Sequence, residues 1–562
     1  PATESLRGGR QIAPMLRLLT SDLVLDEPDD FDMADLPALT RLVHWAGLLG
    51  SRVLLSSATL APALVEGLFL AYRAGRAVYQ QHRSERPSEP VNICCLWIDE
   101  FHQTPQDCAD GPAFREAHSQ YVRKRVAKLQ QAEVRRLAQI APLPDTWSSL
   151  DEAERHQDFA RLVLAQAWEL LHQRPHNHSI DASGKCVSLG LIRMANIAPL
   201  YDVALAMYAL GAPAPDVRVH LCVYHSQFPL LLRSAIEQQL DTLLNRRGTQ
   251  SDHDPALQRP ALRALIDTHP EQHHLFIVLG SPVTEVGRDH DYDWAVVEPS
   301  SMRSLIQLAG RVRRHRSGAV GGVNMVVLDS NLRHFKTPGQ PAYEKPGFET
   351  SHAPFQLKSH YLHDLLSREV GKAAAWAVDA QPRIALPADK LIPSRRWTDL
   401  EHARMHDSLL PKPPGTATPT HAACLHWHEP QPDAPRSLWL TGLLPQFQRF
   451  RYDPQQRDDV ALLPDEEEET LQLHRVQDGK RRYEKVYVPI HQSLCHPVPA
   501  AQLASPSVSP WPQVNGMAEL AALAQAQGLS LEQCAQRYAT ASLPQHQSGW
   551  WFHEALGFTV KK

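Results

Sequence analysis

The sequence predicts an α/β protein with doubly wound parallel sheets, arranged as two α/β units followed by a smaller mixed domain. Short apolar runs at residues 21–25 and 51–55 are typical of buried strands, and residues 36–49 between them show helical spacing of apolar side chains. Strand, helix and strand in that order favour a parallel sheet covered by helices. The same alternation returns further along the chain, which predicts a second unit.

The later elements follow from the same patterns. Residues 91–99 form another apolar run, and residues 114–172 are charged with helical spacing. Strand patterns separated by helical segments return at residues 187–194, 217–224, 275–279, 294–297 and 323–328. We therefore expect a first unit with a helical extension over residues 1–175 and a second unit over residues 176–335.

Proline marks the remaining boundaries. The chain has 45 prolines, and two proline-rich stretches lie at residues 411–415 and 429–432. We expect a linker over residues 336–436 and a mixed accessory domain over residues 437–562. The acidic run at residues 465–469 is typical of a solvated loop.

Composition limits the classes of function. The 562 residues are 43% hydrophobic and 21% charged, with a net charge of −5, so a uniformly basic nucleic-acid-binding surface is excluded and only a local groove remains. No apolar run reaches the ~18 residues that a membrane span needs. Eight scattered cysteines indicate a reducing compartment, and we expect a cytoplasmic protein. The chain opens on Pro1 rather than Met, so we expect a piece of a longer protein.

Two motifs follow the first two strands. Asp26 and Glu27 end the first strand, and nucleotide hydrolysis needs one acid that holds Mg²⁺ and a second that orients the attacking water. An acidic surface turn would have the same sequence. The second strand runs into Ser57, Ala58 and Thr59, which could equally cap the following helix.

Two further motifs lie in the second unit. Gln307, Gly310, Arg311 and Arg314 form a Gln-x-x-Gly-Arg-x-x-Arg pattern. Arginines stabilise the charge on a transferring phosphoryl group, and two arginines three residues apart share a face of a helix. A basic surface helix is the alternative. The segment before this pattern contains Thr284, Gly287 and Asp289 after a predicted strand.

These four motifs, in this order, resemble those of superfamily 2 helicases. Together with residues 44–47, 190–196 and 223–226, the pattern resembles the helicase-nuclease of type I CRISPR interference, of the type I-F subtype. The motifs cover residues 1–335, and residues 336–562 fit only through domain order and overall likeness. The resemblance implies two RecA-like lobes, the first incomplete, and a C-terminal domain. It also implies that an HD nuclease and an adaptation nuclease domain precede them in an amino-terminal portion.

The resemblance implies a function as well. Members use ATP and Mg²⁺ to move along single-stranded DNA, and they degrade invading DNA after recruitment by an RNA-guided surveillance complex. An anti-CRISPR inhibitor is a further implied partner. The implied roles are Mg²⁺ binding by Asp26, water orientation by Glu27, γ-phosphate stabilisation by Arg311 and Arg314, nucleotide binding by Gln307, Gly287, Asp289 and Gly310, and contact or coupling to DNA by Ser57, Ala58, Thr59, Thr284, Arg7 and Arg10.

No segment of this sequence matches the motif of a phosphate-binding loop. It needs Gly-x-x-x-x-Gly-Lys-Ser/Thr, and the Gly-Lys pairs at residues 184, 371 and 479 lack both the leading glycine and the hydroxyl. The resemblance puts this loop and the HD nuclease upstream, so the His-Asp pairs at residues 253, 290, 363 and 406 are not expected to form the nuclease. We expect this chain alone to be inactive and a companion amino-terminal portion to complete the first lobe.

Alternatives stay open at this point. Residues 437–562 could form a non-enzymatic docking module for the surveillance complex, or the chain could be a superfamily 2 helicase of DNA repair. The basic stretch at residues 122–136 could contact DNA or be solvated. His421, Cys424, His426 and His428 could bind a metal, or could cluster by chance among 30 histidines.

Overall fold

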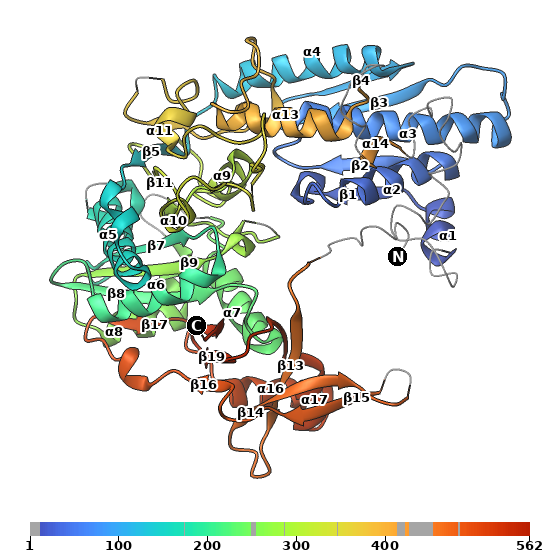
Figure 1. Cartoon of the computed structure of the whole chain (residues 1–562). Helices are drawn as coiled ribbons and strands as arrows, with labels where there is room; N and C mark the ends of the chain where they lie inside the picture. The colour runs from blue at the N-terminus through green and yellow to red at the C-terminus, as the bar shows by residue number, and fades with distance from the viewer. Residues whose placement is uncertain are drawn as a thin grey trace.

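The computed structural model describes residues 12–172, 175–248, 254–285, 287–345, 347–371, 373–412, 422–425, 453–481 and 484–561. These residues form three bodies, which we call the first lobe, the second lobe and the C-terminal domain (Figure 1). The first lobe holds the blue elements, the second lobe most of the green ones, and the C-terminal domain most of the red ones. The α/β fold with a parallel-sheet core is confirmed.

The first lobe combines a parallel strand pair with an antiparallel hairpin, β3 to β4. Helices α2 and α3 lie close together because Gly75 faces the main chain of α2, where a Cβ would collide with the His44 carbonyl oxygen. The elements in chain order are α1 (Ile12–Thr20), β1 (Leu23–Asp26), α2 (Leu36–Leu49), β2 (Val53–Ser56), α3 (Pro62–Arg83), β3 (Ile93–Ile98), β4 (Gln103–Cys108) and α4 (Gly111–Leu129).

The strand pair β1–β2 leaves apolar side chains open to solvent. Val24 and Leu54 are paired across the two strands and are 61% and 55% exposed. Parallel strands are usually covered on both faces. The described part of the first lobe therefore lacks a layer over this face.

The second lobe is built on a large twisted sheet. Among the described residues nine strands join it, in the order β12-β5-β11-β10-β7-β9-β8-β17, with β6 paired to β7. All pairs are parallel except those of β12 and β6. Strands β7 and β8 are buried along their whole length, as their apolar sequences predict.

The elements of the second lobe in chain order are β5 (Leu137–Ala141), α5 (Glu152–His172), β6 (Ser179–Ile180), β7 (Cys186–Arg193), α6 (Ile197–Leu210), β8 (Val217–Tyr224), α7 (Leu230–Leu243), α8 (Pro260–Thr268), β9 (His273–Gly280), β10 (Trp294–Val297), α9 (Met302–Ala309), β11 (Met325–Leu328), α10 (Leu332–Lys336), α11 (Leu362–Leu365) and β12 (Trp376–Ala377).

The boundary between the two lobes lies earlier than the expected residue 175. Strand β5 pairs with β11 in the second sheet, and α5 packs against α6 and β10. Residues 114–172 were expected to form a helical extension of the first unit, so the strand β5 within them was not predicted. The apolar faces of β5 and α5 predict burial but do not say against which sheet, and that is decided by the register with β11.

Residues 336–412 are folded and are not the expected linker. Tyr343 and Trp397 are fully buried. Helix α13 (Trp397–Leu409) packs against α3 of the first lobe and α9 of the second, next to the short helices α12 (Gln381–Ile384) and α14 (Ala422–Leu425). The proline-rich stretches from residue 413 onwards lie outside the described residues.

The C-terminal domain has an antiparallel sheet, β15-β14-β13-β18, a smaller sheet, β16-β19-β20, and two helices. The run 465–469 forms an exposed turn between β13 and β14, as predicted. The elements in chain order are β13 (Arg457–Pro464), β14 (Leu471–Asp478), β15 (Lys485–Pro489), β16 (Cys495–Pro497), β17 (Val508–Pro510), α16 (Gly516–Gln527), α17 (Leu531–Tyr538), β18 (Thr540–Pro544), β19 (Trp550–His553) and β20 (Gly557–Val560).

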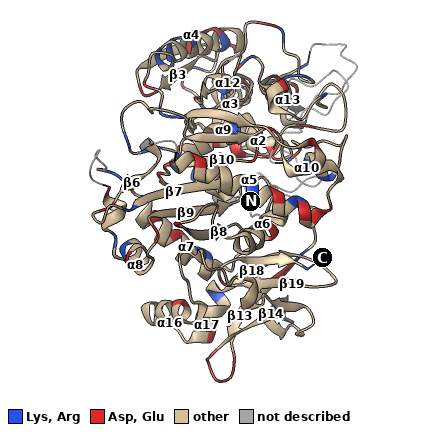
Figure 2. Cartoon of the chain, turned by 90° about the vertical axis from the view of Figure 1, so that its left-hand side faces the viewer, with Lys and Arg blue, Asp and Glu red and all other residues tan. Residues whose placement is uncertain are grey.

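Charged residues of both signs are mixed along the ribbon of the three bodies in the view of Figure 2, which agrees with the near-neutral composition. Within the described residues no helix combines the length and apolar character that crossing a membrane requires.

Candidate active site

The acidic motif and the Ser-Ala-Thr motif are brought side by side by the pairing of β1 with β2. The register pairs Asp26 with Ser56, so the residues after both strands leave the sheet at the same edge. Glu27 takes a left-handed conformation with φ +47°, and its backbone N–H donates to the Ser56 carbonyl oxygen at 2.7 Å. This turn leads into a short 3₁₀ helix, Pro28–Asp30.

The hydroxyls of the second motif bind the carboxylates of the first. Ser57 Oγ donates to Glu27 Oε2 at 2.5 Å and lies 2.7 Å from Asp29 Oδ1. Thr59 Oγ1 donates to Asp29 Oδ2. Asp29 is 1% exposed and was not singled out from the sequence, although it joins the two motifs. Ala58 is exposed beside them.

Helix α9 of the second lobe contacts this acidic turn directly. Gln307 Nε2 donates to Glu27 Oε2 at 3.3 Å. Arg303, which the motif does not contain, donates from Nη1 to the Asp29 carbonyl oxygen at 2.5 Å and lies 2.9 Å from Asp30 Oδ1. The predicted nucleotide residues of the two lobes therefore meet across one interface.

The two arginines of the motif do not share a helix face, contrary to the prediction. Helix α9 ends at Ala309 with Gly310 as its C-cap, and Arg313 has φ +49°, so the chain turns away after the helix. Arg311 donates to the carbonyl oxygens of Glu285, at 2.9 Å from Nη2, and of Arg288. The main chain of the preceding loop thus fixes Arg311.

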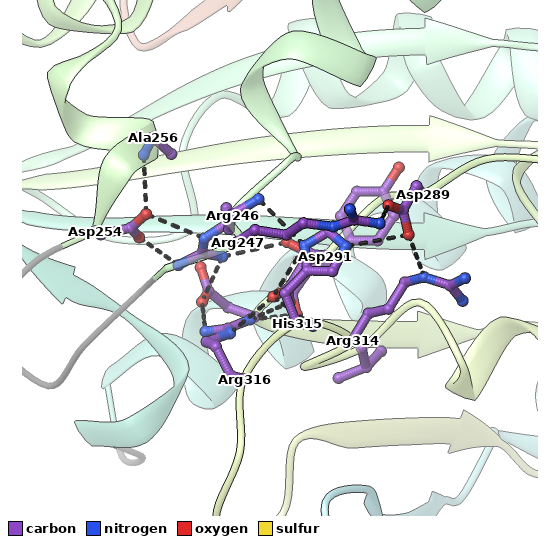
Figure 3. Close-up of polar contacts among 12 residues, drawn as sticks. Arg246, Arg247, Asp254, Ala256, Asp289, Asp291, Arg314, His315 and Arg316 are labelled. Atoms are coloured by element: carbon purple, nitrogen blue, oxygen red, sulfur yellow. Dashed lines mark hydrogen bonds and ion pairs between the residues drawn. The ribbon is translucent and has the colours of Figure 1, made fainter. Parts of the chain in front are cut away.

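Arg314 is held by a side chain instead. Its Nε donates to Asp289 Oδ1 at 2.5 Å, and Asp289 also lies 2.6 Å from Arg247 Nη2 and 3.1 Å from His315 Nε2 (Figure 3). Burial would raise the pKa of Asp289, but hydrogen bonds from His315 and Arg314 outweigh it and hold this pKa well below its usual value. Asp289 is therefore a carboxylate at neutral pH.

A cleft of about 520 Å³ lies between these groups. Its lining residues are Asp26, Glu27, Asp30, Phe31, Gly287, Arg288, Asp289, Arg311 and Arg314. This volume is within the range of small-molecule sites. Six of the predicted catalytic and nucleotide-binding residues line it, and Gln307 reaches Glu27 at its edge.

Glu27 has an altered proton affinity in the cleft. Burial raises its pKa above the usual value, the hydrogen bond from Ser57 opposes this, and the charges of Asp29 and Asp26 add to the increase. A carboxylate with raised pKa accepts a proton or a hydrogen bond from water more readily.

Thr284 does not join the site. It is fully buried, and its hydroxyl donates to the Ser281 carbonyl oxygen at 3.0 Å. In this arrangement it has no surface for the predicted contact with DNA. Arg7 and Arg10 lie outside the described residues.

Sequence reasoning missed a buried ion network behind the cleft (Figure 3). Arg246 is fully buried and contacts Asp254 and, at 2.8 Å, Asp293 Oδ1. Arg316 contacts Asp291 and Asp293, each at 2.6 Å. The sequence signals this network only weakly, through acids at residues 289, 291 and 293, of which the structure buries Asp291 and Asp293.

The Gly-Lys pair at residue 184 lies away from the cleft. Lys185 Nζ donates to the carbonyl oxygens of Ile266, at 2.8 Å, and His269, at 2.5 Å. Within the described part of the chain, no group of three or more His, Cys, Asp and Glu side chains could hold a metal ion. Of the His/Cys cluster only Cys424 is described, and burial raises the pKa of its thiol to about 12.

Two family models match the chain. The model described as CRISPR-associated nuclease/helicase Cas3, C-terminal, matches residues 186–317. The model described as CRISPR-associated Cas3 subtype I-F/YPEST-like, C-terminal domain, matches residues 462–560.

Two curated proteins are similar to the chain, and both are named CRISPR-associated nuclease/helicase Cas3 subtype I-F/YPEST. The protein of Pseudomonas aeruginosa (strain UCBPP-PA14) is 47% identical over 99% of this chain and 48% of its own length. That of Pectobacterium atrosepticum is 46% identical over 73% of this chain and 36% of its own length. Among solved structures, T. fusca Cas3-ADP matches with 17% identity and a TM-score of 0.49 over 100% of this chain and 56% of that one.

Proposed function

Since the chain belongs to the Cas3 subtype I-F/YPEST family of CRISPR-associated nuclease/helicases, we propose that it forms the ATP-driven motor part of such an enzyme, acting on single-stranded DNA. The chain spans about half the length of the first of these relatives, so the activity of the whole protein is part of the proposal. The observation that carries it is the cleft in which acids of one lobe face arginines of the other. The naming of both relatives as CRISPR-associated favours this function over DNA repair.

The residues in the cleft fit ATP and Mg²⁺. Asp26 is exposed on the cleft wall, and carboxylate oxygens are ligands that Mg²⁺ prefers, so Asp26 would hold the ion together with phosphate oxygens. Arg288, Arg311 and Arg314 line the opposite wall, and guanidinium groups suit phosphates. When bound, the ion neutralises charge on the transferring phosphoryl group.

Glu27 is proposed to orient the attacking water. Its raised pKa comes from burial and from the neighbouring acids, and the hydrogen bonds from Ser57 and Gln307 fix the direction of its carboxylate. Because Gln307 belongs to the other lobe, its hydrogen bond to Glu27 forms only when the lobes are together, whereas the bond from Ser57 lies within the first lobe. Hydrolysis would then depend on lobe closure.

Coupling to DNA is proposed through the Ser-Ala-Thr turn. Ser57 and Thr59 bind the acids of the cleft, while Ala58 is exposed on the same turn. A shift of Asp29 or Glu27 on hydrolysis would therefore move this turn and the start of α3. Specific DNA sequence need not be read, because base pairing to a guide RNA would supply the choice of target.

A companion segment is proposed to complete the first lobe. The exposed Val24 and Leu54 mark the sheet face that lacks a cover, and the phosphate-binding loop is not formed by Lys185. Recruitment by an RNA-guided surveillance complex belongs to the same proposal. We assign no DNA cutting to this chain.

The docking-module alternative is less well supported. Strand β17 of the C-terminal domain is the edge strand of the second-lobe sheet, with Trp511 N–H donating to the Leu221 carbonyl oxygen at 2.9 Å. A domain bound in this way acts as part of the motor body.

ATP turnover tests the proposal. The chain alone should hydrolyse ATP no faster than its Glu27→Gln variant. Addition of the amino-terminal segment of the Pseudomonas aeruginosa relative should produce DNA-stimulated turnover, which Glu27→Gln should lower by about 100-fold or more. Turnover by the chain alone that Glu27→Gln abolishes would contradict the need for a companion. Turnover in the completed assembly that survives Glu27→Gln would overturn the assignment of the cleft.

A further inference from the structure

The orientation of Arg311 depends on the loop formed by residues 285–289. Each nitrogen of its guanidinium donates to a backbone carbonyl oxygen, of Glu285 or of Arg288, and none to a side chain. Arg311 therefore points wherever this loop directs it. Arg311 also feels the charge of Glu27 across the cleft.

The described part of the loop has little packing around Gly287. Gly287 has φ +72°, and a Cβ placed there would meet no atom within 4 Å. The loop is instead held at its two ends. Glu285 forms a buried ion pair with Arg193 and accepts a hydrogen bond from Ser304 Oγ at 2.6 Å.

The other end is held by helix α7. Arg288 Nη2 pairs with Glu237 Oε2, and Arg288 Nη1 lies 2.9 Å from Asp241 Oδ2. These acids are one helical turn apart, so both face Arg288 from the same side of α7. Tyr224 Oη donates to Glu237 at 2.6 Å, and His290 Nε2 lies 2.8 Å from Asp241 Oδ1, which fixes the two carboxylates in turn.

We propose that Glu237 and Asp241 are positioning residues for Arg311, acting through Arg288. We call Glu237, Asp241 and Arg288 the α7 clamp. The inference rests on the proposed function, because it gives Arg311 the task of stabilising the phosphoryl group. It goes beyond the four motifs, since neither acid belongs to one of them and neither lines the cleft.

The clamp differs from the other anchor in its exposure. Glu285 and Arg193 are almost completely buried, whereas the Arg288 and Asp241 side chains are 26% and 43% exposed. A second cavity of about 580 Å³ lies beside α7 and is lined by all three clamp residues. Substitutions in the clamp should therefore leave the fold intact and act on the loop.

Helix α7 also joins the cleft to the C-terminal domain. Leu231, near its start, is 5% exposed within the core of that domain, and α7 contacts α16. The clamp follows one and a half to three turns later on the same rigid helix. A displacement of the C-terminal domain would thus reach Arg288 directly.

Hydrogen exchange of the chain tests the clamp without any need for turnover. The double variant Glu237→Gln with Asp241→Asn should exchange the amides of residues 281–293 at least about tenfold faster than the unsubstituted chain. Asp267→Asn is the matched control, because it removes an acid partner of Arg263 on the neighbouring helix α8. Unchanged exchange in the double variant would overturn the proposal.

A second experiment tests whether Glu237 and Asp241 act through Arg288. Arg288→Ala should speed exchange by itself, and the two acid substitutions should add nothing in that background. Full additivity would show an independent effect of the acids and contradict the proposal.

The completed motor gives the functional arm. The double variant should lower kcat for ATP by about tenfold or more with KM changed less than about twofold, because misplaced catalytic groups affect the transition state more than binding. An unchanged kcat in an active motor would overturn the positioning role. If the completed motor shows no turnover at all, the proposed function fails while the exchange experiments still decide whether the clamp holds the loop.

Discussion

Asp29 illustrates how a single buried carboxylate can join two motifs. It is 1% exposed, and burial of an unpaired charge would be costly, yet it accepts hydrogen bonds from Ser57 and Thr59. Its own carbonyl oxygen accepts a hydrogen bond from Arg303 of the second lobe. Contacts from both lobes thus converge on one residue between the predicted acid pair and the Ser-Ala-Thr turn.

The buried ion network leads to a prediction at the same scale. Asp254→Asn should lower the free energy of unfolding at pH 7 by about 2–3 kcal/mol. This is less than the ~3–5 kcal/mol expected for a buried ion left with no partner, because Arg246 still faces Asp293. Urea unfolding of the variant and of the unsubstituted chain measures this difference in the free energy of unfolding.

The pH dependence of this difference follows from the direction of the shift. Burial raises the pKa of Asp254, but the charge and hydrogen bonds of Arg246 lower it more, so its folded pKa lies below the ordinary 3.8. A carboxylate whose pKa is lower in the folded than in the unfolded chain stabilises the fold at pH values above its pKa in the unfolded chain. This contribution is lost as the pH falls toward its pKa in the folded chain. The deficit of Asp254→Asn should be full at pH 7 and smaller at about pH 3. A deficit that grows on acidification would contradict the assignment, and Asp267→Asn on the surface should show little change at either pH.

At the scale of elements, the strands that carry the motifs could be predicted from the sequence and the geometry after them could not. Apolar runs located β1, β2, β7, β9 and β10, because buried parallel strands require them. The end of α9 at Ala309 was missed, since helical spacing of Arg311 and Arg314 continues past it. The carbonyl oxygens of Glu285 and Arg288 offer Arg311 partners that a continued helix could not, and such tertiary contacts are not visible in local spacing.

Helix α13 was hidden for a related reason. It lies in a stretch with many prolines and histidines, and its Glu401 accepts a hydrogen bond from the Met302 N–H at the start of α9 at 2.5 Å. Its other side contacts α3, which follows the Ser-Ala-Thr turn. Helix α13 therefore contacts both the helix that carries the Gln-x-x-Gly-Arg motif and the helix that follows the Ser-Ala-Thr turn.

The contact between α3 and α13 leads to a prediction. A Cβ on Gly67 would lie 2.8 Å from Leu409 Cβ and 2.9 Å from the Leu409 carbonyl oxygen, and neither backbone-linked atom can move away by a rotamer change. Gly67→Ala should therefore lower the free energy of unfolding by about 1–3 kcal/mol and speed hydrogen exchange in α13. In a free helix the same change stabilises by about 1 kcal/mol, so a stabilised variant would contradict the close packing.

At the scale of the whole molecule, segments distant in the sequence complete each other's sheets. Strand β5 precedes the main strands of the second lobe and joins them beside β11, and β17 arrives from the C-terminal domain to pair with β8. Neither strand was predicted from the sequence, because residues 137–141 lie in a stretch with helical spacing and residues 508–510 are too short for a clear pattern. The neighbour of such a strand depends on the path of the whole chain. This is why the expected boundaries at residues 175 and 336 do not match the bodies that the structure shows, although the α/β class does. The expected boundary at residue 437 lies outside the described residues.

The last prediction concerns the attachment of the C-terminal domain. Trp511, directly after β17, is 3% exposed, and its ring packs edge-on against that of Phe276 of β9 with the ring centroids 5.2 Å apart. A residue of the C-terminal segment thus fills part of the second-lobe core. His225 Nε2, 2.9 Å from the Leu556 carbonyl oxygen, and the Phe558 N–H, donating to the Gln227 carbonyl oxygen at 3.0 Å, add polar contacts between the same two bodies. The second lobe and the C-terminal domain should therefore unfold as one cooperative unit.

Trp511→Ala should break this cooperativity. Loss of a buried tryptophan costs about 3–5 kcal/mol, which is enough to let β17 leave the sheet while both cores persist. Calorimetry should show the C-terminal domain melting before the second lobe in the variant, and with it in the unsubstituted chain. Trp97→Ala is the control, because it removes another buried tryptophan, 9% exposed, from the β3–β4 hairpin of the first lobe. If both variants leave the second lobe and the C-terminal domain melting together, β17 is not what joins them, and the route from the C-terminal domain to Arg288 would rest on α7 alone.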